Sequence, residues 1–350
     1  MWGRPLTKTL EKTGFIAVNR ERWVRGWGCS FIWTLFTAFR YFFPMRVFFK
    51  RKHGEGMGRK LFVAGRAIVL AYAVSLAILA GCQRQLIYHP QRADENRLLN
   101  IARGEGLEPW RDEDDEIVGW RTPASGTNPA ENAVVVFHGN AGYALHRTYY
   151  AEGFRAVPGA DTWQVHLFEY PGYGSRCGRP SEKAIKRSAD EAVRPLREKG
   201  MRVFLVGESL GSGVACYLAG KHPRDIAGLL LITPFTGFAD VGRHHYPVFP
   251  VGLLLRERYD NRKALEAYRG PAVFLVAGRD EVIPAPLGLR LHEGYEGPKK
   301  LIVQEDRGHN TLMLQPQAAW WSEAAAFLLD PGKGTGVPAG RPPDNGVAAP

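Results

Sequence analysis

The residues best suited to chemistry are a serine between two glycines, in the sequence Gly207-Glu208-Ser209-Leu210-Gly211. The motif follows an apolar run at 203–206 and precedes a segment with helical spacing, so we expect a strand, a tight turn and a helix. A turn this tight leaves no room for bulky side chains two residues before and two residues after the serine. Because the helix begins directly behind Ser209, the backbone amide of Leu210 can stabilise a developing oxyanion.

A serine hydroxyl is a poor nucleophile unless a general base accepts its proton, and the base needs an acid that orients it. The candidates are His309 as base and Asp280 as acid, since each comes directly after a predicted strand. The carboxyl ends of parallel strands share one edge of a sheet, so we expect both residues near Ser209. Alternatives stay open: Asp280 could cap a helix, Glu281 could be the acid, and His309 could be an exposed loop residue.

Strand and helix signals alternate through most of the chain, which predicts an α/β fold with a mostly parallel sheet flanked by helices. Expected strands are 117–121, 133–138, 165–170, 203–206, 228–232, 272–277 and 301–304, and expected helices are 181–199, one from about 210, and 317–329. The proline-rich and aromatic segment 233–263 interrupts this alternation, and we interpret it as a small cap over the carboxyl edge of the sheet. The whole domain is expected to span 83–330, followed by a disordered tail at 331–350.

The net charge of +11 is concentrated at the N-terminus. Residues 1–60 contain 13 Lys and Arg against 3 Asp and Glu, a balance of +10 that leaves about +1 for the remainder. The body of the chain therefore lacks the basic stripe that a nucleic acid backbone requires, and nucleic acid is excluded as a partner. The four cysteines form no C-x-x-C pair and no metal-ligand spacing, so they predict neither a cysteine-ligated metal site nor a disulfide framework.

Residues 57–82 have the layout of a secretory signal, with basic residues followed by the uncharged run Ala67–Ala80. The end of this run and the two residues after it, Leu79-Ala80-Gly81-Cys82, resemble the lipobox of bacterial lipoproteins, which makes Cys82 a candidate for lipidation. This interpretation predicts a membrane-attached protein on the periplasmic side of a bacterial cell envelope. The alternatives are an uncleaved N-terminal anchor and a buried helix of a soluble protein. If the signal interpretation is right, Met57 is a better start than Met1, and residues 1–56 are an over-extended N-terminus or an unusual basic leader.

Several blocks together resemble the Bem46-like branch of the α/β-hydrolases, close to α/β-hydrolase domain-containing proteins 13 and 17. The matching blocks are Leu86-Ile87-Tyr88-His89-Pro90, His138-Gly139-Asn140-Ala141, Glu169-Tyr170-Pro171-Gly172-Tyr173-Gly174, Gly207-Glu208-Ser209-Leu210-Gly211, Pro234-Phe235-Thr236, Asp280 and Gly308-His309-Asn310. The resemblance implies the α/β-hydrolase fold, N-terminal membrane attachment, and hydrolysis of esters, thioesters or amides without metal or cofactor. It also assigns the second oxyanion amide to Asn140. One departure is Glu169, where relatives commonly carry Asp.

These observations predict a serine hydrolase that forms an acyl-enzyme on Ser209 and acts on a small-molecule or lipid-like acyl substrate. An acyltransferase or a serine peptidase could use the same three residues, and a surface lipoprotein could keep the fold without catalysis. We expect His138 to hydrogen-bond its own loop, and Glu208 and Arg279 to be local ion partners. The sequence does not determine the natural substrate or the oligomeric state.

Overall fold

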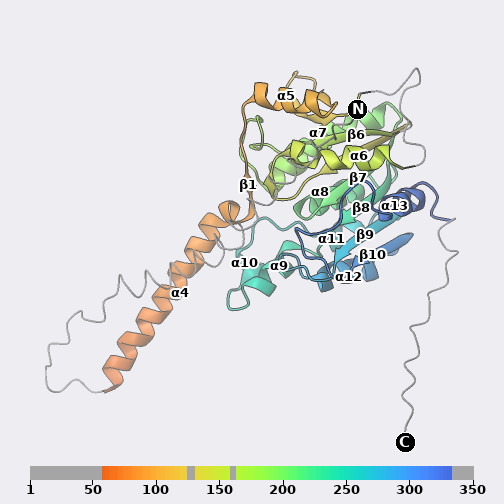
Figure 1. Ribbon diagram of the computed structural model, residues 1–350. Coiled ribbons are helices and arrows are strands. Elements are labelled where there is room, and N and C mark those ends of the chain that lie inside the picture. Colours follow the sequence, from red (N-terminus) through yellow and green to blue (C-terminus); the bar gives the residue numbers. More distant parts are fainter. Residues whose placement is uncertain (1–56, 124–130, 158–162, 333–350) are drawn as a thin grey trace, which may run out of the picture. The chain divides into compact units, whose positions relative to one another are not determined.

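The computed structural model describes residues 57–123, 131–157 and 163–332, which Figure 1 draws as a ribbon. The predicted leader, 1–56, and nearly all of the predicted tail lie outside the described residues. The chain divides into two compact units, Met1–Leu70 and Ala71–Pro350. All the elements that position the candidate site belong to the second unit.

Eight strands form the central sheet, in the order β10-β9-β8-β7-β4-β6-β3-β2. From β10 to β6 the neighbouring strands are parallel, whereas β3 pairs antiparallel with both β6 and β2. The strands are β2 (Glu108–Arg111), β3 (Ile117–Arg121), β4 (Asn132–Phe137), β6 (Trp163–Phe168), β7 (Arg202–Glu208), β8 (Ile226–Ile232), β9 (Ala272–Ala277) and β10 (Lys299–Gln304). The prediction of a mostly parallel sheet is confirmed. A separate pair, β1 (His89–Pro90) and β5 (Ala141–Gly142), is also parallel.

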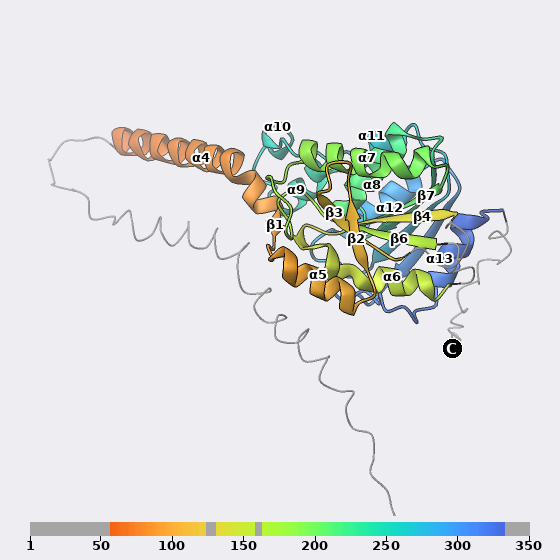
Figure 2. The same ribbon diagram turned by 90° about the horizontal axis from the view of Figure 1, so that it is seen from above.

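Helices cover both faces of the sheet, as Figure 2 shows from above. One face carries α7 (Glu182–Glu198), α8 (Leu210–Lys221), α11 (Asn261–Leu265) and α12 (Ala285–Gly294). The other carries α5 (Glu95–Gly104), α6 (Thr148–Arg155) and α13 (Trp320–Leu329). Side chains of β4 alternate between the two cores: Val135 packs with the first group of helices and Val136 with the second. Burial on both faces explains why this strand is a continuous apolar run.

The predicted cap corresponds to an insertion between β8 and β9. It contains α9 (Phe238–His245) and α10 (Val251–Leu254), and α11 follows before β9 begins. The Nε2 of His245 lies 2.8 Å from the carbonyl oxygen of Val282, in the turn that also holds Asp280. The insertion is therefore attached to the loops that follow the strands, at the carboxyl edge of the sheet.

Helix α4 (Met57–Ile87) precedes β1 and includes the predicted signal or anchor. Its segment Leu61–Ile87 is 27 residues long, and its most apolar window has a mean hydropathy of 2.1 and no buried residue. By length and composition this segment could cross a membrane. Cys82, the lipidation candidate, is exposed within the helix, and the helix continues past it to Ile87.

Candidate active site

Ser209 occupies a strained turn between β7 and α8. Its backbone has φ 52° and ψ −115°, a conformation that L-amino acids rarely adopt and that is normally taken by glycine. Close packing explains the flanking glycines, since a Cβ on Gly207 would lie 2.5 Å from the Cα of Ser212. A Cβ on Gly211 would lie 1.9 Å from the carbonyl oxygen of Phe137. The sequence motif therefore forms the tight strand-to-helix turn that we expected.

Asp280 and His309 form the predicted pair. The Nδ1 atom of His309 lies 2.8 Å from Oδ2 of Asp280. The other carboxylate oxygen, Oδ1, accepts the backbone amides of Val282 at 2.9 Å and Ile283 at 2.7 Å. The Asp280 side chain is 1% exposed, so the carboxylate is fixed by its own turn and presents one oxygen to the imidazole.

The three alternatives for these residues receive no support. Helix α12 has Pro284 at its N-cap and no side-chain cap, so Asp280 does not cap it. Glu281 is exposed, and its carboxylate lies against Gly308. His309 itself has a side chain that is only 12% exposed. The pair that the structure brings together is therefore Asp280 with His309.

All three residues lie at the carboxyl edge of the sheet. Ser209 follows β7, Asp280 follows β9, and His309 follows β10. Within the described residues, the structure records no hydrogen bond between the Ser209 hydroxyl and His309. Contacts of this kind often become short only when substrate is bound. The shared edge thus leaves the imidazole Nε2 as the atom available to a serine proton, because Nδ1 is occupied by Asp280.

The two predicted oxyanion amides belong to the residue after Ser209 and to the loop that follows β4. Leu210 is the first residue of α8, so its amide has no acceptor within the helix. Asn140 is held by its side-chain amide, which donates to the carbonyl of Ile87 at 3.0 Å. The preceding residue, Gly139, is so close to the nucleophile that a Cβ there would lie 3.8 Å from the Cβ of Ser209. Their role as oxyanion donors stays a prediction, and the geometry is compatible with it.

Comparison with known proteins agrees with this geometry. A family model described as the alpha/beta hydrolase fold matches residues 132–250. The uncharacterized protein Rv2307c of Mycobacterium tuberculosis is 34% identical over 235 residues, covering 65% of this chain and 80% of its own length. Bem46 of Schizosaccharomyces pombe is 27% identical over 241 residues, covering 64% and 78%.

The chain belongs to the Bem46-like branch of the α/β-hydrolase family.

Among solved structures, an esterase of Pyrococcus furiosus covers 69% of this chain and 97% of its own, with a TM-score of 0.51 and 15% identity. At that identity the likeness concerns the fold alone. In this α/β-hydrolase, the site residues lie where the family's architecture puts chemistry, at the carboxyl ends of the parallel strands.

His138 and Glu169 support the loop that carries Asn140. The Nδ1 atom of His138 lies 2.7 Å from the carbonyl of Gly139, and its ring packs against Tyr170 with centroids 4.1 Å apart. Glu169 accepts the amide of Ala144 at 3.1 Å, and its carboxylate lies 3.4 Å from Nε2 of His138. His138 is 1% exposed and bonds its own loop as expected.

Glu208, the residue before the nucleophile, has partners that the sequence did not reveal. Arg147 donates to it from Nε at 2.9 Å and from Nη2 at 2.8 Å, and the hydroxyls of Tyr149 and Tyr150 each donate at 3.0 Å. Burial alone would raise the pKa of Glu208, but the Arg147 charge and these hydrogen bonds outweigh it and lower the pKa to about 2. The cluster joins the nucleophile strand to the segment that follows the oxyanion loop. The other predicted ion partner, Arg279, pairs with Asp306 at 2.6 Å on the surface.

Replacing Glu208 with glutamine is expected to destabilise the fold by about 3 kcal/mol at neutral pH, since a largely buried Arg147 would lose its counter-charge. The pKa of Glu208 is lowered from 4.5, so its contribution is fully present above pH 4.5 and is lost as the pH falls toward 2. Urea unfolding of wild type and E208Q at pH 7 and pH 3 should show a smaller difference at pH 3.

The matched control is Glu191→Gln, which removes an exposed ion pair with Arg187. That change should cost less than about 0.5 kcal/mol at either pH. An E208Q protein as stable as E191Q would contradict the importance of the buried cluster.

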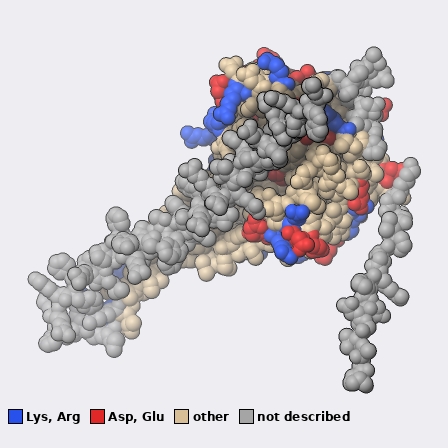
Figure 3. Space-filling model, in the orientation of Figure 1, with Lys and Arg blue, Asp and Glu red and all other residues tan. Residues whose placement is uncertain are grey.

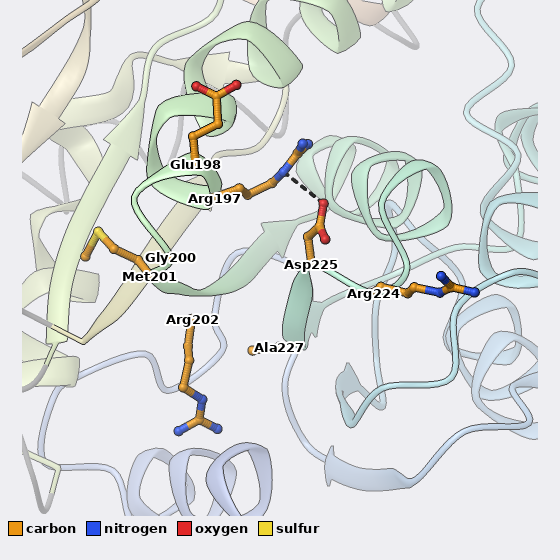
Figure 4. Close-up of a pocket in the computed structure, with 8 residues that line it drawn as sticks. All are labelled: Arg197, Glu198, Gly200, Met201, Arg202, Arg224, Asp225 and Ala227. Atoms are coloured by element: carbon orange, nitrogen blue, oxygen red, sulfur yellow. Dashed lines mark ion pairs between the residues drawn. The ribbon is translucent and has the colours of Figure 1, made fainter.

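The pocket drawn in Figure 4 lies away from this site. It is lined by Arg197, Glu198, Gly200, Met201, Arg202, Arg224, Asp225 and Ala227. Arg202 begins β7 and Asp225 directly precedes β8, so the pocket lies at the amino edge of the sheet, opposite Ser209. An ion pair between Arg197 and Asp225, at 3.3 Å, occupies part of its wall. We therefore assign it no part in the chemistry.

Among the described residues, no cysteine forms part of the site. Cys216 is fully buried on α8, and burial raises the pKa of its thiol. Cys177 is exposed, and its carbonyl accepts the amide of Gly172 at 3.1 Å. Lipidation of Cys82 stays a prediction.

Proposed function

We propose that this α/β-hydrolase is a membrane-attached serine hydrolase that cleaves carboxylic esters or thioesters through an acyl-enzyme. The observation that carries the proposal is the strained backbone of Ser209 at the sheet edge that also holds the Asp280–His309 pair. A non-glycine residue at φ 52° costs stability, and such strain persists at functional sites when the surroundings enforce it. The family membership and the esterase with the same fold agree with this class of reaction.

The mechanism begins when the Ser209 hydroxyl attacks the carbonyl carbon of the substrate and its proton passes to Nε2 of His309. Asp280 holds the imidazole through Nδ1 and stabilises its charged form. The amides of Leu210 and Asn140 would stabilise the tetrahedral oxyanion, a contribution of about 2.7–4 kcal/mol per donor in other enzymes. The intermediate collapses when His309 gives the proton to the leaving alcohol or thiol, which departs and leaves an ester on Ser209.

The second half of the reaction reverses these roles for water. His309 removes a proton from a water molecule as it attacks the acyl-enzyme, and the same proton returns to Ser209 when the acid is released. An alcohol in place of water would give transacylation, and an amide substrate would give peptidase activity. Product analysis with these acceptors and substrates distinguishes the three reactions.

Attachment to the membrane is proposed through α4. The apolar stretch Leu61–Ile87 is long enough to span a bilayer. Side chains on both sides of the Gly81–Cys82 bond contact the insertion: Tyr72 donates to the carbonyl of Val248, and Gln83 accepts the amide of Arg256. These contacts favour an uncleaved anchor over release of the helix by processing at Cys82. The intact mass of the protein recovered from membranes distinguishes the two, because processing would remove everything before Cys82 and add a lipid.

The test of the proposed activity is labelling of the detergent-solubilised full chain with a fluorophosphonate probe, which reacts only with activated serines. We expect one adduct per chain, and mass spectrometry of its peptides should place the adduct on Ser209. Heat-unfolded protein serves as the control and should not react. Folded protein that fails to react would overturn the proposal.

A further inference from the structure

The insertion between β8 and β9 is fastened to the second half of α4. The hydroxyl of Tyr72 donates to the carbonyl of Val248 at 2.9 Å, and its ring stacks on Phe249 with centroids 5.8 Å apart. Gln83, three turns further along the helix, accepts the amide of Arg256 at 2.7 Å and donates to the carbonyl of Leu254 at 3.4 Å. The segment that contains α10 therefore contacts the helix at residue 72 and again at residue 83.

A buried carboxylate joins the insertion to the C-terminal end of α4. Glu257 is 2% exposed and accepts Nε of Arg84 at 2.8 Å and the hydroxyl of Tyr88 at 2.6 Å. The Tyr88 hydroxyl also lies 3.0 Å from that of Tyr259, whose ring packs against Gly213 of α8. Residues 72–88 and the insertion thus pack together with the nucleophile helix.

The outer surface of this turn is apolar and, in the part of the chain that the structure describes, exposed. Residues 248–255 read Val-Phe-Pro-Val-Gly-Leu-Leu-Leu, without a charge. Within them Leu253 is 86% exposed and Val248 is 72% exposed, and Tyr72 of α4, whose hydroxyl bonds the carbonyl of Val248, is 42% exposed. Figure 3 shows the surface over α10 as uncharged. Side chains of this size seldom remain in water without a partner when they occur together.

The length of α4 indicates what this surface meets. A span across a hydrocarbon core of about 30 Å needs roughly 20 residues. Only eleven residues of the apolar stretch, Leu61–Ala71, precede Tyr72, and they rise about 16 Å. A helix that crosses the bilayer must therefore also place residues after Tyr72 in the membrane. The backbone of Val248, bonded to Tyr72, would then reach the boundary of the bilayer together with its side chain.

Charge at the edge of the surface favours the same partner. Arg84, Arg256 and Arg258 lie at the end of the apolar turn, and Arg84 keeps 57% of its side chain exposed although it pairs with Glu257. Arginines that border an exposed apolar surface are typical of segments that lie at the interface with anionic lipid headgroups.

We propose that the turn 248–255 inserts into the lipid bilayer beside α4 and that the active site thereby opens toward the membrane. This inference rests on the proposed function, and it names acyl lipids of the membrane as the substrate class. The insertion lies at the carboxyl edge of the sheet, where Ser209 is, so an acyl chain that enters between insertion and sheet would come directly from the bilayer.

The test measures the environment of position 253 in the full chain reconstituted into vesicles of phosphatidylcholine and phosphatidylglycerol. Leu253→Cys would carry a bimane fluorophore, with serine replacing the native cysteines Cys29, Cys82 and Cys177. We expect lipids brominated in their acyl chains to quench the fluorescence of this bimane. Iodide dissolved in the water should quench it at least threefold less than it quenches the same bimane in unfolded protein without detergent. The matched control is Leu301→Cys on β10, which should respond to iodide alone, since Leu301 is 37% exposed on an edge strand.

If the bimane at position 253 is as accessible to iodide as the bimane at position 301, the proposal that the turn inserts into the bilayer is wrong. Fluorophosphonate labelling of the same samples separates this failure from failure of the proposed function. Quenching by brominated lipid without labelling would support the surface and overturn the substrate class.

A second variant reports on substrate delivery. Leu253→Asp should reduce hydrolysis of a long-chain acyl lipid presented in vesicles by at least fivefold while hydrolysis of a short soluble ester is unchanged. Leu301→Asp should affect neither. Equal losses on both substrates, or no loss on either, would overturn the proposal.

Discussion

Replacement of Ser209 with alanine is expected to reduce ester hydrolysis by at least about 10⁴-fold and to abolish fluorophosphonate labelling, because no other group would take the acyl chain. The fold should be retained, since Ser209 contacts its surroundings mainly through its backbone: its amide donates to the carbonyl of Ile232 at 2.8 Å. Hydrolysis of a p-nitrophenyl ester, measured against wild type at equal concentration, gives the factor. A variant that keeps more than a hundredth of the wild-type rate would show that another residue is the nucleophile.

A companion substitution, Ser209→Gly, separates strain from chemistry. Both variants are expected to be inactive, but glycine tolerates φ 52° and ψ −115° whereas alanine does not. The glycine variant should therefore be more stable than the alanine variant by about 1 kcal/mol, which thermal unfolding of the two proteins measures. Equal stabilities would mean that the turn stores no strain.

Local sequence patterns predicted much of the fold. The strands at Ile117–Arg121 and Ala272–Ala277 have the predicted bounds, because period and β-branching are properties of consecutive residues. The tight turn at Ser209 was equally predictable from the sequence, because two glycines at fixed spacing indicate that neighbouring backbone segments approach closely. The pairing of Asp280 with His309 followed from the rule that parallel strands end at one edge, although the residues are 29 positions apart.

Features that depend on tertiary contacts were not predictable. Glu208 gains its charge partner from Arg147, 61 residues away, and no local pattern marks that arginine. Strand β2 is only four residues long and contains a proline, and it is recognisable only by its pairing with β3. Helix α6 is eight residues long and includes Gly153, which is explained by the Trp321 ring packed against it. The contact between α4 and the insertion joins residues more than 170 positions apart.

The second large effect is expected at Asp280. Asparagine at this position can keep the acceptor bonds to the amides of Val282 and Ile283, which orient the side chain. Its NH2 group must then face Nδ1 of His309, where a carboxylate oxygen now lies at 2.8 Å. An imidazole that accepts at Nδ1 carries its proton on Nε2 and cannot take the proton of Ser209. We expect kcat to fall by about 10⁴-fold, as the equivalent change does in a serine protease.

The control for Asp280→Asn is Glu281→Gln, which makes the same chemical change at the neighbouring carboxylate. Glu281 is exposed and its carboxylate lies against Gly308, so the rate should stay within about twofold of wild type. Both proteins should unfold within about 1 kcal/mol of wild type, because the turn keeps its amide bonds. If Glu281→Gln lowered kcat as strongly as Asp280→Asn, His309 would need a different acid. Loss confined to Asp280→Asn, with labelling of Ser209 slowed in proportion, would tie the reactivity of the serine to the tautomer that Asp280 imposes on His309.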